Sequence, residues 1–187
     1  MTTTPTTIKL TYEDYVCFPD DGKRHELIDG EHYATPAPLM KHQRISGNLS
    51  AAIHHHCQYT KQGRVFAAPI DVVFTETDVV QPDLLYIAKD QDHIITRENI
   101  QGSPDLIVEI LSDSTRHRDE RLKRNLYEQH GVEEYWIVDP ELDSVKLYRL
   151  QDGRYTPPQE LTTEQPDATL TTPLLPSFAP SLSDLFA

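Results

Sequence analysis

The stretch that decides the fold is 104-PDLIVEIL-111, an apolar run that contains one carboxylate, Glu109. Its length and composition predict a strong β-strand. Because side chains alternate along a strand, Glu109 is expected to share a face with Asp105, Ile107 and Leu111. The sequence therefore predicts a carboxylate inside an otherwise apolar strand.

A helix and two further strands are predicted after this run. SDST (112–115) offers helix N-caps, and the helix is expected to continue through His130 and to stop at Gly131. EYWIVD (134–139) and VKLYRL (145–150) are predicted strands on either side of an Asp-Pro turn.

The residues before this run predict helices and strands in turn. They are a capped helix over 12–18, a hairpin over 25–34 that turns at Asp29-Gly30, an amphipathic helix over 41–61 that ends near Gly63, and strands over 64–74 and 79–88 joined by the turn TETD. This order predicts an α/β or α+β domain with a sheet of mixed direction.

The chain length of 187 residues suits a single domain over residues 1–187. Residues 157–187 form a Pro/Thr-rich C-terminal tail that holds six of the 14 prolines. We expect this tail to be extended and packed on the domain. The side chains expected to pack it are Leu174, Leu175, Phe178, Leu182 and Phe186.

The net charge of the chain limits how it can bind nucleic acid. Lys and Arg number 17 against 30 Asp and Glu, a net of 17 − 30 = −13, which argues against a general DNA-coating protein. Residues 116–124 hold five basic side chains against two acidic ones, 5 − 2 = +3, and are expected to guide a polyanion to one place.

Several features predict a cytoplasmic protein that does not contact membranes. Two cysteines, Cys17 and Cys57, fit a reducing compartment rather than a disulfide framework. No apolar run approaches the ~18 residues of a membrane span. The first residues, MTTTPTTIKL, lack the basic start and apolar run of a signal peptide.

Two acids are candidates for chemistry because each lies where a strand prefers apolar groups. Asp83 stands at the head of LLYIA, and Glu109 lies inside LIVEIL. Burying an unpaired carboxylate costs on the order of several kcal/mol, so a cation, hydrogen bonds or a metal must meet it. Two interpretations stay open: a satisfied core acid, paired with Lys123 or an arginine, or a functional site.

The helix after Glu109 adds two candidates. Lys123 and Tyr127 lie four residues apart and share a face, and Leu122 and Leu126 are expected to mark the buried stripe. Lys123 can direct its amine toward the preceding strand. The alternatives are a solvated lysine and a surface ion pair with Asp119.

Other candidate residues are weaker. His54, His55 and His56 point ~100° apart on a helix and cannot converge on one ion, so a solvated face is favoured. His42 is interpreted either as a partner of Glu26 near the acids or as a surface residue at a helix start. Asp71 either lines the same pocket or bonds a neighbouring strand. The chain lacks a Gly-rich phosphate loop, a Cys-x-x-Cys pair and a Gly-x-Ser-x-Gly elbow, which excludes nucleotide kinases, structural zinc modules and α/β-hydrolases.

Taken together, these motifs resemble the PD-(D/E)XK nuclease superfamily, and within it the Uma-type putative restriction endonuclease family of bacteria. The motifs that carry the resemblance are HELIDGE (25–31), HQRISGNL (42–49), VVQPDLLYI (79–87), PDLIVEILSDST (104–115) and RDERLKRNLYEQHGVEEYWIVDP (118–140). They span nearly the whole chain. The resemblance implies a restriction-endonuclease-like core, a mixed β-sheet flanked by helices.

The resemblance also implies a site. It implies Mg²⁺ (or Mn²⁺) bound by Asp83 and Glu109, helped by Glu26, with Lys123 and Tyr127 as further catalytic residues. The superfamily's lysine usually lies two residues after the acid, where this chain has a leucine, so Lys123 on the helix looks like its replacement. We expect its amine to point at Asp83 and Glu109, with Glu26 on the far side.

The implied function is a metal-dependent endonuclease that hydrolyses DNA phosphodiester bonds. A metal would lower the pKa of the attacking water, and a nearby lysine would stabilise charge on the phosphate. The alternative is an inactive nuclease-fold protein that acts as a binding or regulatory module. A homodimer is expected, because double-strand cleavage usually needs two copies and the hairpin and the tail offer apolar surface.

Overall fold

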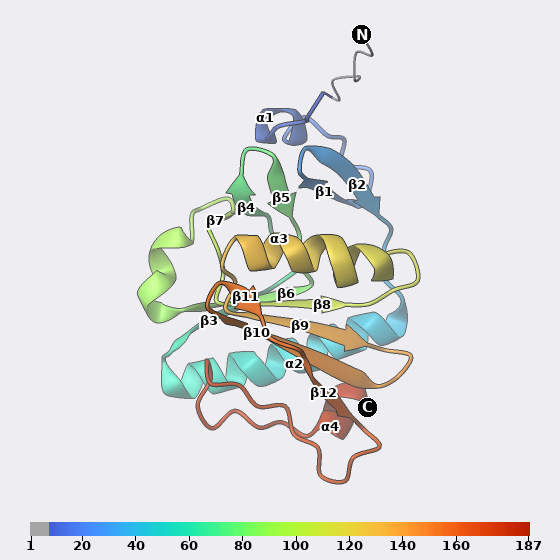
Figure 1. Ribbon diagram of the computed structural model, residues 1–187, viewed down its shortest axis with the longest axis vertical. Helices are drawn as coiled ribbons and strands as arrows, with labels where there is room; N and C mark the ends of the chain where they lie inside the picture. The colour runs from blue at the N-terminus through green and yellow to red at the C-terminus, as the bar shows by residue number, and fades with distance from the viewer. Residues whose placement is uncertain (1–7) are drawn as a thin grey trace.

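The computed structural model describes residues 8–187, which form two β-sheets with helices packed against them (Figure 1). The larger sheet has seven strands in the order β11-β10-β9-β8-β6-β3, with β12 also paired to β10. They are β3 (Gly63–Ala67), β6 (Leu84–Ala88), β8 (Leu106–Ile110), β9 (Glu134–Asp139), β10 (Ser144–Gln151), β11 (Arg154–Tyr155) and β12 (Gln159–Thr162). β8 and β9 run parallel and the other pairs antiparallel, so the predicted mixed sheet is confirmed.

The smaller sheet has five strands in the order β2-β1-β5-β4-β7. They are β1 (Arg24–Ile28), β2 (Glu31–Thr35), β4 (Val72–Thr75), β5 (Asp78–Val80) and β7 (Ile100–Gln101). The predicted hairpin is β1 and β2. Its turn residues Asp29 and Gly30 have φ of 51° and 74°, the left-handed values that a two-residue hairpin turn of this kind requires.

The predicted strands over 64–74 and 79–88 are wrong as continuous strands. The first divides into β3 and β4 and the second into β5 and β6, with the members of each pair in different sheets. Pro69 and Pro82 lie at the divisions, and proline has no N–H to donate to a strand pair. The chain therefore passes from the larger sheet to the smaller and back.

The helices are α1 (Tyr12–Tyr15), α2 (Met40–Thr60), the 3₁₀ helix η1 (Lys89–Ile94), the π-helical turn η2 (Arg118–Lys123), α3 (Arg124–Gln129) and α4 (Leu182–Phe186). The capping box of α1 is present, but α1 ends at Tyr15 rather than Phe18 because its last turn tightens to three-residue hydrogen bonds. α2 ends at Thr60, within a few residues of its predicted end, and its C-cap Lys61 adopts a left-handed conformation.

The helix after β8 runs to Gln129, close to its predicted end, but its buried stripe differs from the prediction. Leu122 is 38% exposed, whereas Lys123, Leu126 and Tyr127 are buried. Lys123 takes the position that faces the buried acids of β1 and β8, and Leu122 points toward solvent instead.

The larger sheet is covered on both faces (Figure 1). α2 covers one face, and the α3 helix and the smaller sheet cover the other. The chain beyond β12 packs on the α2 face through Leu170, Leu175, Phe178, Leu182 and Phe186, which are all buried. Asn48 of α2 donates hydrogen bonds to the carbonyls of Asp184 and Leu185, which fixes α4 on α2.

Among residues 8–187, no helix combines the length and the apolar character needed to cross a membrane.

Candidate active site

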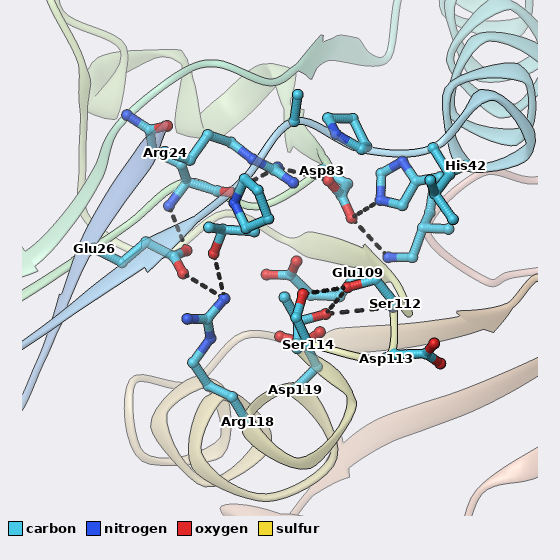
Figure 2. A pocket seen from close by; sticks show the side chains of 18 of the residues that line it. Arg24, Glu26, His42, Asp83, Glu109, Ser112, Asp113, Ser114, Arg118 and Asp119 are labelled. Carbon is cyan, nitrogen blue, oxygen red and sulfur yellow. Dashed lines mark hydrogen bonds and ion pairs between the residues drawn. The ribbon is translucent and has the colours of Figure 1, made fainter. Parts of the chain in front are cut away.

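A cavity of about 230 Å³ opens where the two sheets meet, and most of the predicted site residues line it (Figure 2). β1 contributes Arg24 and Glu26. The link between β5 and β6 contributes Gln81 and Asp83, and α2 contributes His42. The remaining charged lining residues come from β8 and from the segment after it: Glu109, Asp113, Arg118, Asp119 and Lys123.

Glu109 is buried in β8, on the face that α3 covers. Its Oε1 accepts hydrogen bonds from Lys123 Nζ at 2.8 Å and from the Tyr127 hydroxyl at 2.7 Å. Burial raises the pKa of Glu109 to about 8, and the charges of Asp119, Asp83 and Glu26 add to this against the opposing charge of Lys123. Burial likewise holds the pKa of Tyr127 well above its ordinary value, so the phenol stays a donor.

Lys123 is the hub of this cluster. Its Nζ also lies 2.6 Å from Glu26 Oε1 and 3.9 Å from Asp119 Oδ1. Burial alone would lower the pKa of Lys123, but the charges of Glu109, Glu26 and Asp119 outweigh it and hold that pKa above its ordinary value. Three buried acidic side chains therefore share the ammonium of Lys123.

Asp83 has different partners. Arg24 NH1 lies 2.6 Å from its Oδ1, and its Oδ2 accepts from the Ile110 amide at 2.8 Å and from His42 Nε2 at 3.1 Å. Burial would raise the pKa of Asp83, but the His42 hydrogen bond and the Arg24 charge outweigh it and lower it to about 2. Lys123 was expected to point at both acids. In the described part of the chain it reaches Glu109 and Glu26 but makes no ion pair with Asp83.

The structure thus brings Asp83, Glu109, Lys123 and Glu26 to one cavity. Tyr127 lies behind Glu109 and bonds it without lining the cavity. Their catalytic roles stay a prediction.

The weaker candidate residues lie in different places, and not all of them reach the cavity. His42 bonds Asp83 rather than Glu26. Asp71 accepts hydrogen bonds from the Tyr15 hydroxyl and the Gln81 amide and does not line the cavity. The histidines at 54–56 lie on α2, and 54 and 55 are exposed, as expected of a solvated face.

The basic segment 116–124 is only partly a free surface. Arg116 is paired with Asp139 at 2.6 Å. Arg118 donates to the Thr35 hydroxyl at 2.6 Å, and Lys123 is buried. The expected steering patch is therefore smaller than its residue count suggests.

Four charged lining residues lie outside the predicted catalytic and metal-binding set: Arg24, Asp113, Arg118 and Asp119. Arg24 and Glu26 alternate in β1, a pattern that predicts a shared face but not which face is buried. Asp119 lies four residues before Lys123, a spacing for which a surface ion pair is one of the alternatives given above. It is in fact 1% exposed.

The donor set of the cavity fits a divalent cation. Within residues 8–187, no three His, Cys, Asp or Glu side chains converge as a ready-made metal site. Mg²⁺, however, is usually held by one or two carboxylates plus waters. The cavity lining carries five Asp and Glu side chains against three Lys and Arg side chains, and carboxyl oxygens are the hard ligands that such an ion takes.

Comparisons with known proteins agree with this fold. The family model Uma2, described as "Putative restriction endonuclease", matches residues 12–183. A crystal structure of a putative nuclease belonging to DUF820 from Anabaena variabilis ATCC 29413 superposes with a TM-score of 0.79 at 22% sequence identity. The match covers 95% of this chain and 97% of that one, and it supports the predicted nuclease fold. A search of curated proteins gives no match.

Proposed function

The chain belongs to the Uma2 family, described as putative restriction endonucleases, and from this premise we propose that it is a metal-dependent endonuclease that hydrolyses DNA. The observation that carries the proposal is the buried cluster at the junction of the sheets. Glu109 and Asp83 line one cavity in which acidic side chains outnumber basic ones, and where an ion and a phosphate can meet.

Asp83 and Glu109 would hold the ion, Mg²⁺ or Mn²⁺. Lys123 and Tyr127 both bond Oε1 of Glu109, and no hydrogen bond from the described residues reaches its Oε2. Asp83 accepts three hydrogen bonds, while a carboxylate offers about four acceptor positions. Each acid therefore keeps a lone pair for an ion, which when bound would activate water and neutralise charge on the phosphate.

The basic residues of the cavity would serve the substrate. Arg24 and Arg118 line it, and a guanidinium recognises phosphate oxygens through two parallel N–H donors. Arg24 also orients Asp83, and Lys123 also orients Glu109. The same groups thus position the acids and attract the polyanion.

A second function is supported by a specific observation. Asp83 is already neutralised by Arg24, and Glu109 already contacts Lys123. This is the arrangement expected of core acids in an inactive nuclease-fold protein that binds a partner.

A cleavage assay separates the two functions. Supercoiled and linear DNA are incubated with the purified protein and Mg²⁺ or Mn²⁺, beside Asp83→Asn, Glu109→Gln and the control Asp90→Asn. Asp90 is exposed in η1, outside the cavity. The nuclease proposal expects cleavage by wild type and Asp90→Asn, loss in the other two, and loss with EDTA. Equal nicking by all four proteins would indicate contamination and refute it.

We also propose a homodimer, because cutting both strands usually requires two sites. The tail no longer supports this, since its large apolar side chains are buried in the core. Exposed apolar surface does lie at the start of α2, beside the cavity, where Leu39 is 78% and Met40 87% exposed. Light scattering that gives the 21.4 kDa monomer mass at micromolar concentration would contradict the dimer.

A further inference from the structure

Asp119 is a buried acid in the cavity with a free oxygen. Its side chain extends from η2 into the cavity toward Glu109 (Figure 2). The residue is 1% exposed, and within residues 8–187 its Oδ1 has no hydrogen-bond partner. Buried polar atoms are almost always satisfied by protein or by ordered water, so this oxygen calls for a ligand that can donate a hydrogen bond.

The surroundings of this oxygen indicate which ligand. Lys123 Nζ lies 3.9 Å away, too far for a direct hydrogen bond but suited to a bridging water. An ammonium has three N–H donors, and Glu26 and Glu109 take two of those of Lys123. The third can donate to a water that itself donates to Asp119.

We propose that Asp119 is the catalytic base of the nuclease: it holds the attacking water together with Lys123 and takes the proton from that water. The inference rests on the proposed function, and it assigns a role to a residue outside the predicted set.

The other charged groups of the cluster are poorer bases. Lys123 lies among three acidic side chains and acts as a hydrogen-bond donor to them. Both oxygens of Glu26 are engaged. One accepts from Lys123 and from the backbone N–H of Gln81, and the other lies 3.4 Å from Arg118. Asp83 and Glu109 are the acids assigned to the ion, and Asp83 already accepts three hydrogen bonds. Asp119, in contrast, keeps a buried oxygen without a hydrogen-bond partner among the described residues, so this oxygen can accept a hydrogen bond from a water and then take its proton.

The step balances as a hydrolysis. The water oxygen forms a bond to phosphorus while one of its protons passes to an oxygen of Asp119. The bond between phosphorus and the leaving sugar oxygen breaks, and that oxygen takes a proton from solvent. Asp119 returns its proton to solvent before the next turnover.

The test compares Asp119→Asn, Asp119→Ala and the control Asp90→Asn with wild type in Mg²⁺. Lys123 keeps Glu26 and Glu109 in both Asp119 variants, so no buried charge loses all its partners and both are expected to fold, which circular dichroism checks. Four quantities are measured: kcat, KM, the Kd for uncleaved DNA in Ca²⁺, and the rate of Asp119→Ala in added formate.

Loss of a positioned base is expected to lower kcat by about 100- to 10 000-fold. KM and Kd should stay within about threefold, since the base does not hold the substrate. Formate, small enough for the cavity, should restore part of the rate of Asp119→Ala and should not affect Asp90→Asn. Rescue is the result that a purely structural role would not produce.

Three outcomes would overturn the inference in different ways. If both Asp119 variants cleave within about threefold of wild type, Asp119 is not the base and the nuclease proposal stands. If they lose DNA binding together with cleavage and formate restores nothing, Asp119 is a structural residue. If wild type itself does not cleave under any of the metals, the proposed function fails and the base assignment falls with it.

Discussion

Replacing Glu109 by glutamine should make the stability of the protein less sensitive to pH. The folded protein holds the pKa of Glu109 at about 8, against an ordinary value of 4.5. A carboxyl with a raised pKa favours folding fully below pH 4.5, and that contribution is lost as the pH rises toward 8. Glutamine has no proton to lose, so the variant should not show this loss.

The size of the effect follows from the window between these two values. Between pH 5 and pH 7 the unfolded chain is mostly ionised at Glu109 and the folded chain mostly is not. Each pH unit therefore removes on the order of 1 kcal/mol of wild-type stability through this group, or roughly 3 kcal/mol over the window. Glu109→Gln should gain about that much relative to wild type.

The assay is urea unfolding of both proteins at pH 5, 6 and 7 in EDTA, followed by circular dichroism. Only the difference between the two free energies of unfolding is interpreted, because groups common to both proteins largely cancel. Asp90→Asn is the control, and its difference from wild type should stay flat, since Asp90 is exposed.

Two results would refute the reasoning. A difference that stays constant from pH 5 to pH 7 would show that Glu109 ionises near its ordinary pKa in the folded protein. A difference that moves in favour of wild type would show that the charge of Lys123 outweighs burial and lowers the pKa of Glu109.

Three further predictions concern Lys123, the binding of Mg²⁺ and the packing of the C-terminal tail. Lys123→Met should lose about 3–5 kcal/mol of stability in urea at pH 7, because the buried acids Glu26, Glu109 and Asp119 lose the ammonium that they share; a loss below about 1 kcal/mol would contradict this central role of Lys123. Millimolar Mg²⁺ should raise the melting temperature of wild type with concentration and leave Glu109→Gln unchanged, and a wild-type melt that ignores Mg²⁺ would favour the inactive-binder function. Leu170→Ala should lower the urea midpoint by the equivalent of about 2–5 kcal/mol, because the tail completes the core on the α2 face.

Local patterns were enough for the parts of the fold that depend on neighbouring residues. The apolar run around Glu109 predicted β8, and the alternation of side chains along a strand predicted that Glu109 shares a face with Ile107. Asp83 and Glu109 could be identified because a carboxylate in an apolar strand needs a special partner. Strand β9 and the Asp29-Gly30 hairpin followed from equally local signals.

The remaining features depend on contacts between distant segments. The spacing of Asp119 and Lys123 is the same on a solvated helix and on a buried one, and only packing against β8 separates the two. Arg24 reaches Asp83 across 59 positions of sequence, which no local pattern encodes. The two-sheet arrangement likewise required the pairing of β5 with β1, although Pro69 and Pro82 marked where the strands divide.

The π-helical turn of Arg118–Lys123 fixes how many residues this part of the chain can have. A π turn corresponds to an α-helix with one inserted residue, and such insertions are often kept at functional sites. Deleting one residue here would regularise the helix but rotate everything before it by ~100°, carrying Asp119 away from the cavity while Lys123 stayed in place. Length changes among relatives should therefore avoid this turn and fall in exposed loops such as 19–23.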